Sequence, residues 1–220
     1  MDEQIVPFKG RGSLKHYNPQ KPHKWGYKIY VISESSGFAY DFEIYSGKEN
    51  NVLLDGERDC GASGNIIIRL ARSIPSNLNH KLYFDNYFTN PEVQVFLAQR
   101  GIYALGTARC NRVANCTMMS DAELKKRGRG AICEKVSIIY NVKITTVRCY
   151  DNRIVNFLSS FVCGQPACEV TRWSKKVCRY EQVPCPNIVS IYNTHMGGVD
   201  LLDSLIGLYR CRLKSKKWYH

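Results

Sequence analysis

The chain has 220 residues, 44% of them hydrophobic, so it can bury one large core or two smaller ones. Its 31 lysines and arginines outnumber its 19 acidic residues, and the net charge of +12 favours a polyanionic partner, nucleic acid above others. Ribosomal, heparin-binding and secreted basic proteins share this balance, so charge alone leaves the partner open. The sequence shows neither a secretory signal nor an apolar run of roughly 18 residues, so we expect neither secretion nor a membrane partner.

Ten cysteines are spread along the chain without a C-x-x-C pair. In the absence of a secretory signal we expect reduced thiols. Cys163, Cys168, Cys178 and Cys185 are the four that could be combined into a zinc site. Their gaps of four, nine and six residues do not match the paired spacing of zinc ligands, so we predict that they are not structural metal ligands.

The N-terminal segment combines a short strand with a basic loop. Residues 5–8 predict an edge or terminal strand, because the run contains a proline. The loop over residues 9–24 is rich in lysine, arginine and histidine, and Gly10 and Gly12 would let its backbone approach a phosphate closely. A solvated basic loop with no ligand is the alternative. Residues 27–33 and 38–45 then predict a hairpin, and residues 66–74 predict a helix.

A carboxylate stands at the end of a predicted buried strand. Residues 82–84 predict this strand, and Asp85 follows it directly. Asn90 as N-cap and Pro91 at the first helical position predict a helix that ends after Arg100, before a glycine. Open α/β sheets tend to bind their ligands at such strand ends. The alternative is an aspartate that caps its own turn.

A strand over residues 102–107 completes the order strand, strand, strand, helix, strand, helix, strand. One acid lies on the first strand and another ends the fourth. This order matches the ribonuclease H-like fold. We therefore predict an α/β fold whose ribonuclease H-like core, a mixed sheet flanked by helices, begins with residues 1–109.

Residues 110–186 begin with a polar, basic stretch and continue with several β-rich runs. They predict a mostly β insertion domain that interrupts this core. Ser120 and Glu123 form a capping box for one short helix. Strands are expected over residues 131–140, 142–150, 153–162, 171–177 and 179–183.

Residues 187–220 predict two helices that form the last part of the core. The apolar stripe of the second helix is Val199, Leu202, Ile206, Tyr209 and Leu213. Asp200 and Asp203 are neighbours on another side of this helix, where the alternative is two solvated acids. The sequence has no helix-ending signal at its last residues, so we expect a fragment of a longer protein.

Acids on the first strand, at the tip of the fourth strand and on a late helix together indicate a cation site. Carboxylates gathered without a counter-charge raise one another's pKa. Magnesium prefers oxygen ligands and is commonly held by one or two carboxylates with substrate phosphates. Two such ions roughly 4 Å apart can activate an attacking hydroxyl and stabilise the leaving oxygen in phosphodiester chemistry. A basic chain would attract the phosphates.

Four stretches of the sequence resemble the piggyBac transposase family and its domesticated derivatives. They are residues 2–11 (DEQIVPFKGR), 84–89 (FDNYFT), 106–112 (GTARCNR) and 196–203 (MGGVDLLD). The resemblance implies that Asp2, Asp85 and Asp200 are catalytic and hold two Mg²⁺ (or Mn²⁺) ions. It also implies a catalytic role for the nearby Asp203. Because Asp200 lies in the first turn of the predicted helix and Asp203 nearly one turn further in, we expect Asp200 to be the third metal ligand and Asp203 an outer partner. The family's N-terminal dimerisation region and C-terminal zinc-binding domain have no counterpart in these residues.

The resemblance implies a nuclear DNA transposase. Its chemistry is nicking at a transposon end, attack of the freed 3′-hydroxyl to form a hairpin, and joining to TTAA targets by a full-length homodimer. We expect this chain alone to be inactive. Basic residues expected to contact DNA are Lys9, Arg11, Lys24, Arg109, Arg112, Arg212, Lys214, Lys216 and Lys217. The alternative is a domesticated DNA-binding protein that keeps the fold but does not cut DNA. An RNA-binding module is not supported, because the sequence has no aromatic RNP-type strand.

Overall fold

The first 44 residues form an antiparallel sheet of four strands. The computed structural model describes residues 1–19, 21, 23–47, 51–113, 117–175 and 177–209. The strands of this sheet are β1 (Asp2–Pro7), β2 (Lys15–Tyr17), β3 (Trp25–Ser33) and β4 (Ala39–Ile44). β3 pairs with β1 along one edge and with β2 and β4 along the other. Within the described residues β1 pairs with β3 alone, which confirms the edge strand that its proline predicts.

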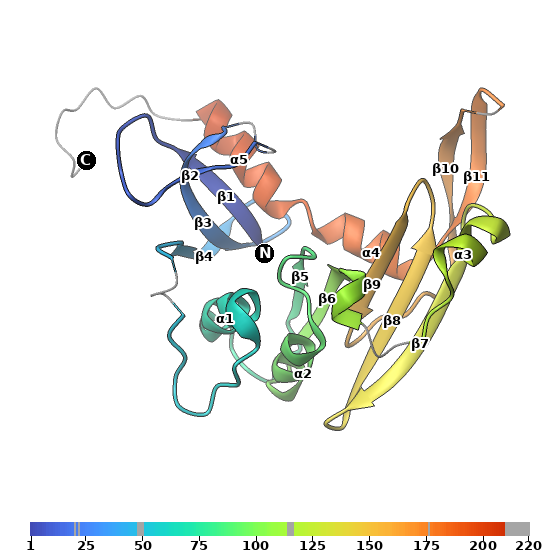
Figure 1. Ribbon diagram of the computed structural model, residues 1–220, viewed down its shortest axis with the longest axis horizontal. Coiled ribbons are helices and arrows are strands. Elements are labelled where there is room, and N and C mark those ends of the chain that lie inside the picture. Colours follow the sequence, from blue (N-terminus) through green and yellow to red (C-terminus); the bar gives the residue numbers. More distant parts are fainter. Residues whose placement is uncertain (20, 22, 48–50, 114–116, 176, 210–220) are drawn as a thin grey trace.

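A second sheet of five strands forms the centre and the other end of the molecule (Figure 1). In spatial order its strands are β5 (Lys81–Phe84), β6 (Tyr103–Ala108), β9 (Ile154–Ser159), β8 (Val142–Tyr150) and β7 (Ile132–Ile139). β5 and β6 are parallel, and the other pairs are antiparallel. The three-stranded meander predicted as part of an insertion therefore extends the sheet of β5 and β6. Strands β10 (Cys168–Ser174) and β11 (Arg179–Cys185) form a separate hairpin.

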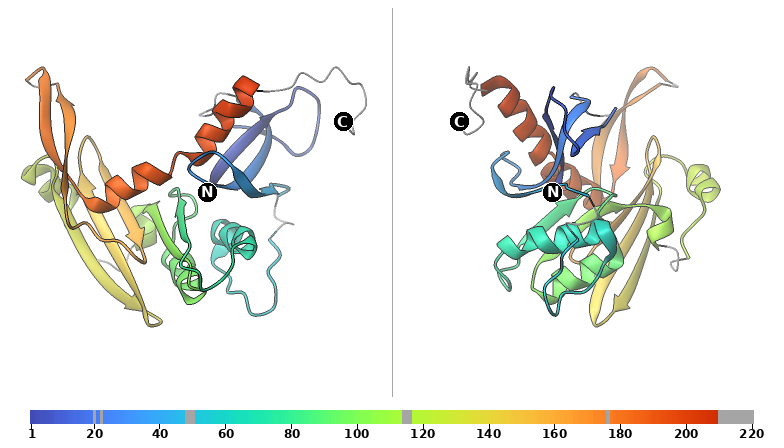
Figure 2. Two further views of the ribbon diagram at one scale, coloured as in Figure 1. Left: turned by 180° about the vertical axis from the view of Figure 1, so that it is seen from behind. Right: turned by 60° about the vertical axis from the view of Figure 1, so that its left-hand side comes forward.

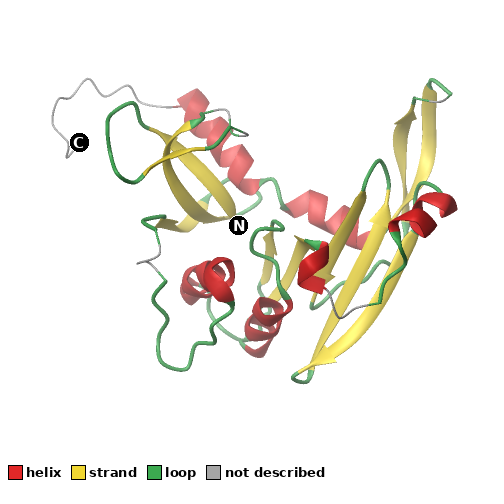
Figure 3. Ribbon diagram, in the orientation of Figure 1, coloured by secondary structure: helices red, strands yellow, loops and turns green. Residues whose placement is uncertain are grey.

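The described helices are α1 (Gly61–Leu70), α2 (Pro91–Gln99), α3 (Asp121–Arg127), α4 (Asn187–His195) and α5 (Gly198–Tyr209), with 3₁₀ turns η2 (Ala71–Ser73) and η3 (Cys110–Val113). α2 and α4 lie on opposite faces of the second sheet, whereas α1 and α5 pack against the first sheet (Figure 3). α4 and α5 run one after the other from the β10–β11 hairpin to the first sheet (Figure 2). Among the described helices, none has both the length and the apolar character needed to cross a bilayer.

Alternating residues of the central strands separate two hydrophobic layers. On one face, Val147 and Phe157 pack with Ile188 of α4. On the other face, Ile144 and Leu158 pack with Val95 of α2. Because successive strand side chains point to opposite faces, each strand contributes to both layers. A third cluster joins the first sheet to α1, α2 and β5 through residues that include Tyr30, Ile67, Phe84 and Leu97.

Local sequence signals correctly predicted the ends of several elements. Asn90 accepts a hydrogen bond from the Val93 amide at 2.8 Å, and Pro91 opens α2. Gly101, with φ of 68°, follows the Arg100 cap. Ser120 and Glu123 make the capping box of α3. Both predicted hairpins and the meander are present.

Three predictions of local structure were wrong. α1 begins at Gly61 rather than at residue 66, because its first turn carries no side-chain cap that would mark it. A short strand, β2, lies inside the predicted basic loop. The expected apolar stripe of α5 is buried only at Val199, whereas Ile206 and Tyr209 are 46% and 77% exposed. The N-terminal end of α5 packs closely on the β3–β4 turn, and the helix then leaves this contact. Leu213 lies outside the described residues.

Candidate active site

Asp85 stands at the end of β5, next to the parallel strand β6. Its backbone carbonyl accepts the hydrogen bonds that form the following turn, from the Phe88 amide at 3.1 Å and the Thr89 amide at 3.3 Å. Its side chain is free of that turn and accepts instead from Thr107 Oγ1 of β6, at 3.1 Å. The carboxylate therefore does not cap its own turn. The neighbouring strand orients it.

Asp2 opens β1 of the first sheet and is half-buried. Its Oδ1 accepts a hydrogen bond from the Glu3 amide at 2.7 Å. Burial raises the pKa of this carboxyl, and the nearby Asp85 raises it further; the Glu3 hydrogen bond and the Lys21 ammonium act in the opposite direction. Asp2 and Asp85 thus lie close enough to repel each other when both are ionised.

One cavity of about 580 Å³ contains these two acids and Asp200 from the first turn of α5. Its lining includes Asp2, Glu3, Asn18, Lys21, Asp85, Asn86, Arg109 and Asp200. The Lys21 ammonium lies 3.9 Å from Asp200 Oδ1, and the Asp200 side chain is 74% exposed. The structure therefore brings together the three aspartates predicted as metal ligands, from β1, from the end of β5 and from α5.

The donor atoms of this cavity suit a hard cation. Asp2 and Asp85 offer carboxylate oxygens, and Asn86 adds an amide oxygen on the same lining. Mg²⁺ commonly takes one or two carboxylates and completes its shell with water and substrate phosphates. Among the described residues, no three acids, histidines or cysteines lie close enough together to enclose a metal ion. The fit is thus to a site of two carboxylates that a phosphate completes, with Asp200 further out.

Asp203 lies away from this cavity. Its Oδ1 accepts a hydrogen bond from Gln4 Nε2 of β1 at 2.5 Å. It lines a neighbouring groove, which shares Lys21 and Asp200 with the acid cavity. Asp203 therefore attaches α5 to β1, and its role as an outer partner stays a prediction.

The basic residues expected to contact DNA occupy several environments. Lys9, Arg11 and Lys24 are exposed in the loops around β2, and Arg109 is exposed on the cavity lining. The guanidinium of Arg112 instead donates to the backbone carbonyls of the Asp85 loop, at Tyr87 (2.8 Å) and Thr89 (2.9 Å), so the structure uses it as a support. Arg212, Lys214, Lys216 and Lys217 lie outside the described residues.

Three residues of the site were missed from the sequence. Lys21 lies among many basic neighbours, and nothing in the sequence distinguishes it. Thr107 stands in the 106–112 stretch, and its position one strand away from Asp85 could have indicated its hydrogen bond. Tyr192 of α4 hydrogen-bonds with Thr107. The pKa of the Tyr192 phenol is raised to about 12, chiefly by burial and also by the negative charge of Asp85, whereas the hydrogen bond to Thr107 lowers it.

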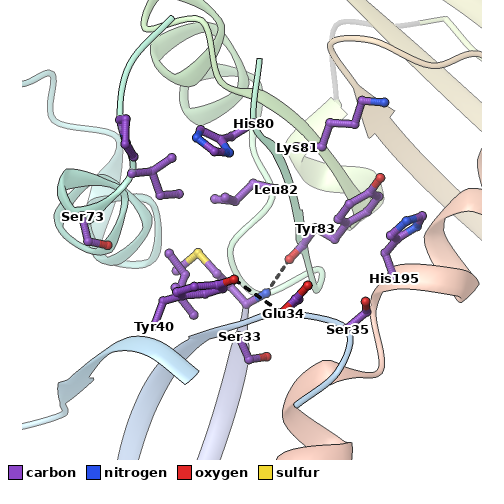
Figure 4. Close-up of a pocket in the computed structure, with 14 residues that line it drawn as sticks. Ser33, Glu34, Ser35, Tyr40, Ser73, His80, Lys81, Leu82, Tyr83 and His195 are labelled. Atoms are coloured by element: carbon purple, nitrogen blue, oxygen red, sulfur yellow. Dashed lines mark hydrogen bonds between the residues drawn. The ribbon is translucent and has the colours of Figure 1, made fainter. Parts of the chain in front are cut away.

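A second cavity, of about 460 Å³, lies between the β3–β4 turn and β5 (Figure 4). The Met1 amino group donates to the Tyr83 carbonyl at 2.6 Å, and the ring of Tyr83 stacks on His195 at 4.6 Å. Burial lowers the pKa of the Met1 amine to about 6. Glu34 is the one acid on the described lining, so this cavity has no cluster of carboxylates.

The cysteines do not form the zinc quartet considered above. Cys168 and Cys185 oppose each other at the open end of the β10–β11 hairpin, whereas Cys178 lies at its turn. Cys163 hydrogen-bonds the Gln165 carbonyl in the preceding loop. The Cys168 and Cys185 side chains contact each other, but Cys178 lies at the opposite end of the hairpin, so the four sulfurs cannot share one ion.

Comparison with known proteins assigns the chain to a family. The family model described as Transposase IS4, the piggyBac-type transposases, matches residues 1–220. The chain belongs to the piggyBac-type transposase family. PiggyBac transposable element-derived protein 3 of Homo sapiens is 31% identical over 220 residues, and PiggyBac transposable element-derived protein 2 of Homo sapiens is 28% identical over 219 residues. Each alignment covers 99% of this chain and 36% of the human protein, so the chain spans about a third of these relatives.

A solved structure of the family has the same fold. The chain matches the cryo-EM structure of the piggyBac transposase synaptic complex with hairpin DNA, with a TM-score of 0.68 and 24% identity. The match covers 99% of this chain and 41% of that one. The mixed α/β arrangement described above is therefore the fold of this part of the piggyBac transposase.

Proposed function

We propose that this chain is the catalytic core of a piggyBac-type DNA transposase, which cuts and joins DNA at transposon ends with a divalent metal ion. The observation that carries the proposal is the single cavity that receives Asp2, Asp85 and Asp200 from three distant parts of the sequence. A solvated surface acid needs no such convergence. A family relative was solved as a synaptic complex with hairpin DNA, which supports DNA as the partner.

In this proposal Asp2 and Asp85 would hold the cation, and Asp200 would act from the exposed side of the same cavity. Thr107 fixes the orientation of the Asp85 carboxylate. Lys21 and Arg109, both on the cavity lining, bind the phosphate that enters. A bound Mg²⁺ or Mn²⁺ supplies activation of the attacking hydroxyl and neutralises charge on the phosphate. The attacking group is water or a DNA 3′-hydroxyl, so no side chain of the protein needs to act as nucleophile.

Several features of the complete protein belong to the same proposal. They are action at TTAA targets, a homodimer and a nuclear location. We also propose that the core is ribonuclease H-like. Its sheet would run β4, β3, β1, β5, β6, since β1 and β5 already meet where the Met1 amine binds the Tyr83 carbonyl. Residues 1–109 and 187–220 would then form the core, and residues 110–186 the insertion.

A second candidate function is that of a domesticated DNA-binding protein without strand cleavage. The relatives that carry the names of transposable element-derived proteins favour it. It predicts DNA binding without metal-dependent cutting. An assay of DNA nicking therefore distinguishes the two candidate functions.

Nicking of a labelled transposon-end duplex by the full-length protein is that assay. Wild type should nick in Mg²⁺ and in Mn²⁺, whereas Asp85→Asn and Asp200→Asn should each lower the rate by at least about a hundredfold, because each removes a carboxylate from the cation site. Asp203→Asn is the matched control on the same helix. Its oxygen can still accept from Gln4, so it should lose only a few-fold and keep activity in Mn²⁺.

Wild type that binds DNA and nicks in neither metal would support the second candidate. Inactive Asp203→Asn together with active Asp200→Asn would show that the third ligand is assigned to the wrong residue. Thermal unfolding of Asp85→Asn, measured beside a calorimetric Mn²⁺ titration, separates loss of the metal from loss of folding.

A further inference from the structure

Two aromatic rings lie together on the surface beside the candidate active site. Tyr17 ends β2, and Trp25 begins β3 directly opposite it in the antiparallel register. Their ring centroids are 4.7 Å apart and the ring planes are inclined by 43°. Tyr17 is 51% exposed and Trp25 54% exposed. About half of each ring therefore remains available to a ligand.

Positive charge surrounds this aromatic pair. Lys15 lies 5.2 Å from the centroid of the Trp25 ring, and its ammonium donates to the Gly10 carbonyl rather than to an acid. Lys24 precedes Trp25 in the chain and is exposed. An aromatic face bordered by cations suits a planar base attached to a phosphate backbone.

The same hairpin connects the aromatic pair to the acid cavity. Asn18 follows Tyr17, and its amide donates to the Lys24 carbonyl at 2.8 Å, which closes the loop between β2 and β3. Asn18 and Lys21 of this loop line the cavity of Asp2 and Asp85. Tyr17 is adjacent in the chain to Asn18 of the cavity lining, with Cα atoms about 3.8 Å apart, so the aromatic pair and the acid cavity share one short loop.

We propose that Tyr17 and Trp25 form a stacking site for an unpaired nucleobase of the DNA strand held in the acid cavity. The inference rests on the proposed function, because it takes DNA as the substrate. Bases within a duplex are already stacked, so the site selects single-stranded or locally opened DNA. The stacking site should accept all four bases, because every base has a π-face that can stack on an aromatic ring.

A second exposed aromatic pair supplies a matched control. Trp173 and Tyr180 also oppose each other across a hairpin, with ring centroids 5.2 Å apart and an edge-on angle of 71°. Their arginine neighbours face acids: Arg172 Nε lies 3.3 Å from Asp151, and Arg179 Nε lies 3.7 Å from Glu181. These cations are less available to a phosphate, and this pair does not adjoin the acid cavity. We therefore assign base stacking to Tyr17 and Trp25 alone.

Fluorescence anisotropy with labelled oligothymidylate of about 15 nucleotides tests the proposal on the whole chain. The double variant Tyr17→Ala/Trp25→Ala should lose about tenfold in affinity for the single strand, and less than twofold for a duplex. The dependence of affinity on salt should keep its slope, since no cation is removed. Trp173→Ala/Tyr180→Ala should lose less than twofold for either DNA.

Two further variants protect the test from loss of folding. Tyr17→Phe/Trp25→Phe keeps an aromatic ring at each position and should retain affinity within about threefold. Trp173→Phe/Trp218→Phe leaves Trp25 as the last of the three tryptophans, and oligothymidylate should quench its fluorescence.

The possible results separate this inference from the proposed function. Equal losses for single strand and duplex, equal losses in the two aromatic pairs, or unchanged binding by Tyr17→Ala/Trp25→Ala would overturn the stacking site and leave DNA as partner. Wild type that binds no DNA even at low salt would overturn both.

Discussion

Two carboxylates of the candidate site, Asp85 and Asp200, face partners from distant parts of the chain. Asp85 receives its hydrogen bond from Thr107 of the next strand, and the loop that follows it is supported by Arg112. Asp200 faces Lys21 of the β2–β3 loop. The acids themselves could be predicted from the sequence, because strand ends and helix starts are marked by local signals. Their partners could not, because Lys21 and Arg112 look like any other basic residue of a chain with 31 of them.

Arg112 should contribute to stability rather than chiefly to DNA affinity. Arg112→Ala leaves the carbonyls of Tyr87 and Thr89 without their donor, so we expect a loss of about 1–3 kcal/mol in the free energy of unfolding, measured in urea. Arg109→Ala is the control, because Arg109 is exposed and its hydrogen bond to Asn86 is long, at 3.4 Å. It should change stability by less than about 0.5 kcal/mol. Equal effects of the two substitutions would contradict the support assigned to Arg112.

Asp2 should destabilise the fold at neutral pH when no metal is bound. Burial is the main cause that raises the pKa of Asp2 in the folded state. Below the ordinary aspartate pKa, Asp2 is protonated in both the folded and the unfolded state and has no effect on stability. As the pH rises through the folded pKa, the buried carboxylate becomes charged and lowers the free energy of unfolding. Asp2→Asn removes this cost and keeps the oxygen that accepts from Glu3. In the presence of a chelator the variant should raise the melting temperature by a few degrees at pH 7, with no gain near pH 3. The exposed Asp55→Asn should do neither, and a lower melting temperature of Asp2→Asn at pH 7 would show that the carboxylate stabilises the native state.

At the scale of elements, what could be predicted depended on sequence distance. The caps of α2 and α3 and the β7–β8 turn, where Tyr140 and Asn141 have φ of 48° and 63°, lie within a few residues and were found. The pairing of β6 with β9 was not, because Leu105 and its partner Ser159 are far apart in the chain. The sequence of β9 carries no signal that shows whether its free edge pairs with a core strand or with another strand of the insertion.

The docking of α5 depends on one glycine. A Cβ added at Gly198 would lie 2.2 Å from the Glu34 carbonyl oxygen, whereas one at Gly197 would meet nothing within 4 Å. Gly197 is the N-cap of α5, a position that prefers glycine to alanine, so Gly197→Ala should cost no more than about 1 kcal/mol. Gly198→Ala should cost about 2 kcal/mol or more and increase amide exchange along α5, because the backbone of the β3–β4 turn must move. Similar exchange in the two variants would show that α5 does not need this contact.

The molecule as a whole places its acids and its bases differently. The acids of the site lie in one cavity between the first sheet, β5 and α5, whereas basic residues extend over the loops around β2 and continue after α5 in the sequence. Net charge favours a polyanionic partner from composition alone. Composition cannot say where such a partner would bind, because that depends on how β1, β5 and α5 converge.

Charge rather than base sequence should therefore govern DNA affinity of this chain. Binding should be weak, nearly independent of duplex sequence, and steeply reduced by salt, because cations that neutralise phosphates release counterions. Replacing Arg210, Arg212, Lys214, Lys216 and Lys217 by glutamine tests this without touching the described fold. The slope of log affinity against log salt should fall by about 0.9 for each phosphate contact removed, equally for unrelated duplexes. Five exposed acids changed to their amides, Asp55 among them, make the opposite control: affinity should rise at low salt and converge with wild type at high salt. An affinity that resists salt, or that differs strongly between duplex sequences, would show that base contacts dominate.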